Sequence, residues 1–460
     1  MPPQIASIII ILFISFVFID DLRKEWYKSN GLLIPFFWLL IVSSRAVSVW
    51  FNPGQGIEDP DVYLEGSPLD RNIFIFLMVL GIFVLIRRRI NWLDIFKNNF
   101  FLIALFSFAF LSVVWSEYPI VSLKRYMKAI GSAEMALIVA TEADVLAAIN
   151  NILRRLSFIH IPLSVLFIKY YPDLGRGFTR SGDAQFIGVT LQKNSLGLIC
   201  MIFGLFYLQK LFSLLPEWSI LYRKKDFYIT IVFLAMISWL QYMADSATSL
   251  LLLIFGIVLL LLFENKFFKI YIKYLGILII VSVSLFFLFE FLFNVTGNII
   301  DLLGRDITLT GRVPLWEELL KEKINPLFGC GFDSFWLGNR AQYYWDKYWW
   351  HPNQAHNGYL EVYLNMGYLG LGFLMFYLLS AYRNIRSHFF NNYPFGKLGL
   401  VLFIIILIYN ITEGIFFKLD LLWILVIIFS IKTDVSISLS YQINKLINIL
   451  IRKVYQDKQL

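Results

Sequence analysis

The stretch ATSLLLLIFGIVLLLLF, residues 247–263, decides the fold class of this chain. It contains no charged side chain, and its length falls in the range that an α-helix needs to cross a membrane, about 20 mostly apolar residues. Similar stretches recur along the whole chain of 460 residues, of which 58% are hydrophobic and only 16% are charged. A soluble protein of this composition would expose large apolar patches. The sequence therefore predicts an all-α, polytopic integral membrane protein.

The apolar stretches predict twelve or thirteen transmembrane helices. The stretch at 122–141 is the weakest candidate, because it begins with Lys124, Arg125 and Lys128. The first stretch has no small-residue cleavage site and is followed by charged residues, so we expect a retained span rather than a signal peptide. The candidates lie near 4–20, 31–50, 71–87, 98–115, 122–141, 153–170, 194–213, 227–244, 247–264, 270–294, 358–381, 397–413 and 417–432.

The basic residues orient these spans. The net charge is +8, and alternating spans bring clusters such as Arg87-Arg88-Arg89 and Arg154-Arg155 to one side, which we expect to be cytoplasmic. The outer side then receives three polar loops, at 51–70, 171–193 and 295–357, and the N-terminus if the spans number thirteen. We expect no nucleic-acid partner, because no basic stripe with interleaved aromatic residues lies outside the apolar stretches.

We divide the chain into four parts: ten spans in 1–294, an extracytoplasmic loop at 295–357, the last spans in 358–432, and an amphipathic cytoplasmic tail at 433–460. The two cysteines, Cys200 and Cys330, could form a disulfide. Neither has other metal-ligating residues near it in the sequence. We expect no metal site and no cofactor.

The loop 295–357 holds the most informative pattern. Pro314 suits the first turn of a helix, and the apolar residues that follow recur at helical spacing, which predicts an amphipathic helix over 312–323. Asn325-Pro326 ends it, Gly329-Cys330-Gly331 predicts a tight turn, and an aromatic-rich run fills 332–350. We expect those aromatic rings to stack on sugars or to form a lid.

His356 stands at the start of a span, followed by Asn357 and, five residues on, by Glu361. Histidine is the usual side chain for taking a proton from a hydroxyl near neutral pH, and Glu361 could orient it if the helix starts irregularly. The alternative is an interfacial histidine whose partners are backbone groups or water. A zinc site is weakly supported, because the chain has four histidines and no cysteine pair.

Arginines in the loop 171–193 suggest an anion site. Arg176 and Arg180 stand among glycines, and a guanidinium binds pyrophosphate through paired hydrogen bonds. Lys193 and Asn194 follow at the start of a span. The alternative is salt bridging with the aspartates of the same loop. Lys124 and Arg125 form a further basic group on the same, outer side, where the orientation rule does not predict basic residues. Either a bound lipid phosphate or an error in the span count would explain them.

These motifs, in this order, resemble the O-antigen ligase and O-antigen polymerase superfamily. The resemblance lies in Thr310-Gly311-Arg312, Trp316, Asn325-Pro326, Gly329-x-Gly331, His356-Asn357-Gly358-Tyr359-Leu360-Glu361 and Gly367, and in Gln192-Lys193-Asn194-Ser195-Leu196-Gly197 after an arginine-bearing loop. It extends to the whole topology, about a dozen spans with one long periplasmic loop late in the chain.

The resemblance implies a metal-independent, inverting glycosyltransferase of the GT-C type in the bacterial inner membrane, with its active site facing the periplasm. Its donor would be an undecaprenyl-diphosphate-linked glycan, and its acceptor a hydroxyl of a lipid A–core sugar or of another glycan. By position, the family's histidine and two arginines match His356, Arg312 and Arg176, with Arg180 as an alternative to Arg176. Lys124, Arg125, Lys193, Asn194, Asn357 and Glu361 would bind substrate, and membrane lipid would surround the protein.

Other functions fit parts of this pattern. A polymerase of O-antigen or exopolysaccharide shares the same motifs, and we lean to the ligase only on the His-Asn-x-Tyr-Leu-Glu arrangement. A transporter or flippase of lipid-linked glycans would place charges near the midplane of many spans, whereas the unexplained charges here gather at one face. A non-catalytic scaffold would not need His356-Asn357 beside two arginine-bearing loops.

Overall fold

The computed structural model describes residues 1–23, 29–51, 67–88, 90–178, 182, 184–214, 225–265, 274 and 312–433. These residues are almost entirely helical, and the one sheet among them is a pair of short antiparallel strands, β1 (Arg176–Phe178) and β2 (Ala184–Phe186). The α-helices are α1 (Pro3–Arg23), α2 (Leu33–Val42), α3 (Val47–Phe51), α5 (Pro68–Arg87), α6 (Trp92–Asn98), α7 (Phe100–Ser112), α8 (Pro119–Ala140), α9 (Val145–Tyr170), α10 (Pro172–Gly175), α11 (Lys193–Leu214), α13 (Lys225–Ala244), α14 (Ala247–Glu264), α18 (Arg312–Leu319), α19 (Gly338–Lys347), α20 (Gly358–Asn391), α21 (Tyr393–Thr412) and α22 (Leu421–Ser430).

The fold class is that of an all-α, polytopic membrane protein, as predicted. Eight of the described helices are long and apolar enough to cross a membrane, or nine if the bent pair formed by α6 and residues 100–115 makes one span. The apolar helices α2 and α22 are shorter, and α8 carries basic residues in its first half. Each expected span except 270–294 overlaps a described helix. Apart from Tyr274, that stretch lies outside the described residues, as do the first part of the expected loop, 295–311, and the expected tail from 434 onward.

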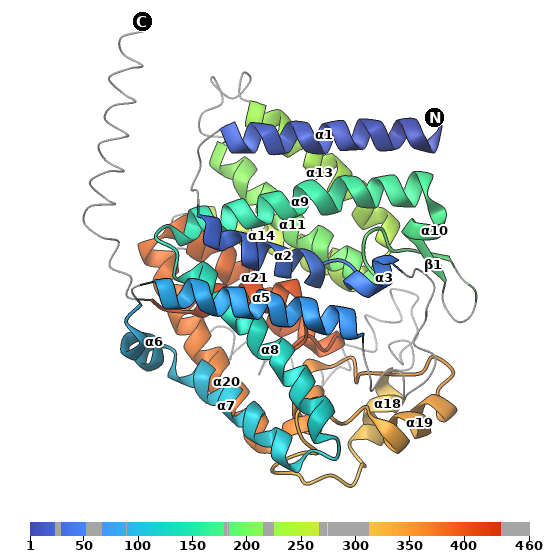
Figure 1. Cartoon of the computed structure of the whole chain (residues 1–460), viewed down its shortest axis with the longest axis vertical. Coiled ribbons are helices and arrows are strands. Elements are labelled where there is room, and N and C mark those ends of the chain that lie inside the picture. Colours follow the sequence, from blue (N-terminus) through green and yellow to red (C-terminus); the bar gives the residue numbers. More distant parts are fainter. Residues whose placement is uncertain are drawn as a thin grey trace, which may run out of the picture.

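The two ends of the helix bundle can be told apart by the contacts that α1 makes at each of them. At one end Asp21 of α1 contacts Arg154 and Arg155 of α9, and at the other end Ser7 of α1 lies 2.9 Å from the hydroxyl of Tyr171. We call the second end the insertion end, because the insertion 312–357 packs there against residues 115–125 and 412–418. Figure 1 shows α18 and α19 at this end and α6 at the other. The predicted gathering of Arg88, Arg154 and Arg155 away from the polar loops is therefore confirmed.

A break in α20 receives the insertion. Gly367 has φ +63° and interrupts the helix, and the amides of Tyr368 and Leu369 donate to the carbonyls of Pro326 and Leu327 instead of to their own helix. A Cβ on Gly367 would lie 2.3 Å from the carbonyl carbon of Leu327, so only glycine fits this approach. The break fixes the insertion against α20.

The insertion departs from the prediction in two places. The amphipathic helix α18 ends at Leu319 rather than at 323, because residues 320–322 form a turn whose amides donate to carbonyls three or four residues back. The aromatic run contains the helix α19, which was not predicted, and its Tyr344 and Trp345 are buried. The tight turn at Gly329 and Gly331 is confirmed by φ angles of +66° and +100°.

The aromatic run builds a small core of its own. Phe335, Trp336 and Tyr344 are almost fully buried and pack on the apolar face of α18. These three rings therefore offer no face to a sugar, whereas Tyr343 and Trp349 of the same run are exposed. Cys330 lies in the same core and Cys200 in the main one; both thiols are free, so no disulfide joins them.

Candidate functional site

The centre of the candidate site is a contact between His356 and Glu413. His356 precedes α20, and its backbone takes a left-handed conformation with φ +51°. Glu413 is the first residue after α21, 57 positions further along the chain. The Nδ1 atom of His356 lies 3.0 Å from Oε2 of Glu413, and the His356 side chain is 20% exposed. Non-glycine residues with positive φ concentrate at functional sites, where the surrounding structure holds them.

Glu413 joins two further segments of the chain. Its Oε1 accepts a hydrogen bond of 3.0 Å from Nη2 of Arg312 and one of 3.1 Å from Nδ2 of Asn194, the second residue of α11. Arg312 also donates to the carbonyl of Thr412. Burial by itself would raise the pKa of Glu413, but the hydrogen bonds and positive charge of His356 and Arg312 outweigh it and hold the pKa below its usual value. The carboxyl group is therefore ionised at neutral pH.

This arrangement sets the chemistry of the imidazole. An ionised carboxylate only accepts hydrogen bonds, so a neutral His356 carries its proton on Nδ1 and presents a basic Nε2. The negative charge of Glu413 would also stabilise the imidazolium that forms when Nε2 takes a proton. The pair can therefore act as a general base at the insertion end.

Glu361 makes its hydrogen bonds with residues other than His356, which it would have oriented if the helix had an irregular start. Its Oε1 accepts hydrogen bonds from Nε1 of Trp336 (2.8 Å) and from the amide of Ala355, and Nδ2 of Asn365 donates to Oε2. The reason is that α20 starts at Gly358, so His356 is not on its helical face. Glu361 instead holds the backbone immediately before His356.

Two other residues nominated for substrate binding are occupied by structural contacts. Oδ1 of Asn357 accepts from the amides of Tyr359 and Leu360 and so caps the N-terminus of α20. Nζ of Lys193 lies 3.3 Å from a carboxylate oxygen of Asp245, in the turn between α13 and α14. Lys193 remains one-third exposed.

Arg176 lies in β1 and is exposed. Its guanidinium is 5.4 Å from the ring centroid of Phe186 on the paired strand, and no hydrogen bond or ion pair within the described part of the chain joins it to His356 or Arg312. Arg180 lies outside the described residues. The structure therefore places Arg176 on an anchored hairpin, without direct contact to the His356–Glu413 pair.

The anchor of that hairpin is Arg45, a residue between α2 and α3. Its guanidinium donates to three backbone carbonyls of the loop, those of Leu174, Gly188 (2.8 Å) and Thr190 (3.0 Å). Arg45 is only 5% exposed. The charged side chain of Arg45 therefore attaches this loop to the helix bundle.

Arg125, near the start of α8, contacts an acidic residue of the insertion. Nη1 of Arg125 donates to the carbonyl of Asp333 (2.7 Å) and lies 3.7 Å from its carboxylate, which Nζ of Lys418 contacts at 2.7 Å. Lys124 makes no hydrogen bond or ion pair with the residues that the structure describes. The contact with Asp333 explains Arg125 without a bound phosphate.

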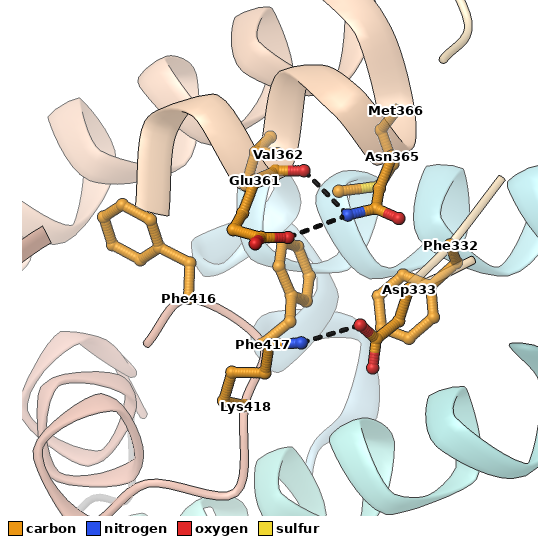
Figure 2. A pocket seen from close by; sticks show the side chains of 9 residues that line it. All are labelled: Phe332, Asp333, Glu361, Val362, Asn365, Met366, Phe416, Phe417 and Lys418. Atoms are coloured by element: carbon orange, nitrogen blue, oxygen red, sulfur yellow. Dashed lines mark hydrogen bonds and ion pairs between the residues drawn. The ribbon is translucent and has the colours of Figure 1, made fainter. Parts of the chain in front are cut away.

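A small pocket, with room for little more than water, lies close to the His356–Glu413 pair, and Figure 2 shows its lining residues. It is formed by Glu361, Val362, Asn365 and Met366 of α20, Phe332 and Asp333 of the insertion, and Phe416, Phe417 and Lys418 after α21. Gly414 links the pocket to the His356–Glu413 pair. Gly414 directly follows Glu413, and a Cβ on Gly414 would lie 3.1 Å from Cγ of Glu361, which lines the pocket. Among the described residues, no group of three or more His, Cys, Asp or Glu side chains is arranged to hold a metal ion.

The fold and site define a polytopic membrane protein with a histidine–carboxylate pair at one end of its helices. Residues 230–375, which include Arg312 and His356, match the family described as O-antigen ligase. The chain is also similar to the exopolysaccharide production protein ExoQ of Rhizobium meliloti (strain 1021), with 22% identity over 291 residues. That match spans 60% of this chain and 62% of the relative's length. Both matches support the O-antigen ligase and polymerase superfamily.

Proposed function

We propose that this protein is an O-antigen ligase-type glycosyltransferase of the bacterial inner membrane. It would move an undecaprenyl-diphosphate-linked glycan to a hydroxyl of a lipid A–core sugar on the periplasmic side. The observation that carries the proposal is the His356–Glu413 contact of 3.0 Å, with Arg312 bound to the same carboxylate. It provides a base and a positive charge at the end of the bundle where the insertion lies.

The proposed step is a single displacement without a metal ion. Nε2 of His356 takes the proton of the acceptor hydroxyl, whose oxygen then attacks the anomeric carbon of the donor. The bond between that carbon and the diphosphate oxygen breaks, and its electron pair leaves with the diphosphate. Attack from the face opposite the leaving group inverts the anomeric configuration. Positive charge would stabilise the departing diphosphate, as electrostatic catalysis requires.

Arg176 and Arg312 are our candidates for that charge, and Arg180 and Lys124 are further candidates from the sequence. Arg312 is bound to Glu413 and Thr412 and would bind the diphosphate with its remaining donors. Arg125 is a weaker candidate than the sequence suggested, because Asp333 already balances its charge. The exposed guanidinium of Arg176 suits an anion that arrives from outside the bundle.

A polymerase is the second candidate. The name of the relative in Rhizobium meliloti refers to exopolysaccharide production, which is compatible with joining one repeat unit to another. The chemistry at His356 would be the same, because both reactions deprotonate a sugar hydroxyl.

The test is to delete the gene and to examine the cell-surface polysaccharide. Polymer that accumulates on the lipid carrier and is absent from lipid A indicates a ligase, whereas single repeat units on the acceptor indicate a polymerase. The deletion strain is then complemented with the wild type, with His356→Ala and with His351→Ala. His351 stacks on Trp345 in the same loop and has no part in the proposed step, so it is the matched control.

We expect His351→Ala to restore the polysaccharide and His356→Ala to leave it absent, with both variants present in the membrane in equal amounts. Restoration by His356→Ala would refute the assignment of the base.

A further inference from the structure

We propose that Asn410 is a positioning residue for the proposed base and that it acts through its contact with Gly358. This inference rests on the proposed function and adds to it a residue outside the His356–Glu413 pair. Asn410 lies in the last turn of α21, three positions before Glu413. Gly358 is the first residue of α20, two positions after His356. Each member of the pair is therefore only a few residues from this contact.

The side chain of Asn410 is fully buried and holds the turn that carries Glu413. Its Oδ1 accepts hydrogen bonds from the amides of Ile415 (3.1 Å) and Phe416 (3.3 Å), and its Nδ2 donates to the carbonyl of Ile406 (2.9 Å). Buried amides beyond the end of a helix need acceptors, and an asparagine side chain offers an acceptor and donors in one group. The chain from Asn410 to Phe416, which includes Glu413, therefore closes on this one side chain.

Gly358 allows the start of α20 to reach this side chain. A Cβ at position 358 would lie 2.0 Å from Oδ1 of Asn410 and 2.7 Å from its Cγ, which is closer than such atoms can approach. Gly358 is not one of the glycines with positive φ, so close packing rather than backbone conformation requires a glycine here. The Asn410 side chain could make room for a larger residue only by giving up its own hydrogen bonds.

Two further contacts hold α20 against α21 and the turn that follows it. The hydroxyl of Tyr359 donates to the carbonyl of Leu407 (3.0 Å), and its ring packs edge to face on Phe416 with centroids 5.4 Å apart. A Cβ on Gly414 would lie 3.8 Å from the amide nitrogen of Gly358, which is ordinary van der Waals contact. The start of α20 therefore cannot slide past the turn without breaking these contacts.

A displacement at the Gly358–Asn410 contact would reach the base directly. Asn357 stands between His356 and Gly358, and its side chain caps α20, so a shift of the helix start moves His356 as well. The contact of 3.0 Å between His356 and Glu413 would then change. Misplacing a reacting group by about 1 Å can lower a rate roughly 100-fold.

Asn194 and Arg312 also hold Glu413, but they act in a different way. Both donate to its carboxylate, so replacing either one changes the electrostatic surroundings of the carboxylate as well as its position. The hydrogen bonds of the Asn410 side chain all go to backbone groups. Replacing Gly358 or Asn410 therefore tests the position of the pair more directly.

The test compares Gly358→Ala, Asn410→Ala and the double variant with the wild type. The first measurement is the initial rate at which polymer appears in the complemented deletion strain, divided by the amount of protein in the membrane. The control is Gly372→Ala, which adds the same methyl group to the same helix at a position with open space around it.

A second measurement reports the position of the imidazole without any turnover. The full-length protein is labelled with isotopic nitrogen in its histidine rings and studied by solid-state NMR in lipid vesicles. The chain has four histidines, and the spectrum of His356→Ala identifies the signals of His356. In the neutral ring of the wild type we expect the proton on Nδ1, which faces Glu413. Gly358→Ala should remove this preference, because the contact that fixes the tautomer is lost.

We expect Gly358→Ala to lower the rate roughly 100-fold and the control to leave it unchanged. Asn410→Ala should also lower the rate, because the turn that carries Glu413 loses its acceptor. In the double variant the added methyl group enters the space that Oδ1 of Asn410 occupied. Gly358→Ala should therefore lower the rate less than about tenfold when Asn410→Ala is already present, since changes at residues in contact are not additive.

Three results would each overturn the proposal: a wild-type rate in Gly358→Ala, a proton that stays on Nδ1 of His356 in that variant, or additive effects of the two changes. A lower rate with an unchanged tautomer would mean that the contact only supports the fold. The proposed function fails separately, through transfer that survives in His356→Ala. The tautomer measurement would then still decide whether Gly358 and Asn410 position the imidazole.

Discussion

The change Glu413→Gln tests the proposed base directly, because it keeps the shape of the side chain and removes its charge. In the wild type, Oε1 accepts from Arg312 and Asn194, and Oε2 accepts from His356. A glutamine has a single amide oxygen. That oxygen would face Arg312 and Asn194, because the opposite orientation would point the amide hydrogens at two donors.

The amide nitrogen of the substituted side chain would then face Nδ1 of His356. Two donors cannot share that contact, so the imidazole proton would move to Nε2 and Nδ1 would become the acceptor. Nε2 would no longer be basic. A wrong tautomer of this kind in a triad costs roughly 10³–10⁴-fold in rate, or about 4–5.5 kcal/mol of transition-state stabilisation. The fold should change much less, because both hydrogen bonds to the amide oxygen remain.

The assay is the initial rate at which polymer appears after the variant is induced in the deletion strain, divided by the amount of protein in the membrane. Glu318→Gln serves as the control, since Glu318 lies in the same insertion and its carboxylate pairs with Lys347. A rate for Glu413→Gln within about tenfold of the wild type would show that Glu413 does not set the tautomer, because loss of the basic Nε2 should cost at least about 4 kcal/mol.

Three further predictions concern the loop anchor, the helix break and the ion pairs. Replacing Arg45 by Met should lower the free energy of unfolding by about 1–3 kcal/mol for each loop carbonyl that stays buried without a donor. Limited proteolysis of this variant should then cut the chain within 171–192. Gly367→Ala should lower the melting temperature in detergent, because it adds a Cβ at φ +63° against the insertion, whereas Gly372→Ala, with open space around it, should not. The pKa values of Glu413 and Asp333 are depressed below 4.5 and 3.8, so their stabilising contribution is complete above those values. The melting temperature should therefore fall only as the pH drops below about 4, and a fall beginning near pH 6 would contradict these ion pairs.

The proposed base, His356, was nominated from the sequence, but its partner Glu413 was not. His356 and Arg312 were predicted from the order of short motifs, and the structure brings both to one carboxylate. Glu413 was visible only as an acidic residue next to Thr412 at the end of an apolar stretch. Its contacts span 57, 101 and 219 positions, and no local periodicity reports how helix ends so far apart in the chain meet.

Helical spacing failed at Glu361 for a definite reason. Glu361 could have oriented His356 if the helix had an irregular start, but Asn357 caps α20 and His356 lies before it with φ +51°. The break at Gly367 escaped prediction as well, because hydrophobic character continues through it and marks a single span. Hydropathy therefore predicts that a segment crosses the membrane, while its start and its breaks depend on the loop that packs against it.

The positive charges at the insertion end can be separated by what balances them. Arg125 is matched by Asp333, and Arg312 by Glu413, in both cases through acidic residues from distant segments. Neither arginine needs a bound phosphate to explain its position. Arg176 differs, because it is exposed in β1 and its guanidinium lies, within the described chain, over the ring of Phe186. A ring leaves the hydrogen-bond donors of a guanidinium available. Of these three arginines, Arg176 is therefore the one whose charge no carboxylate within the described chain already balances.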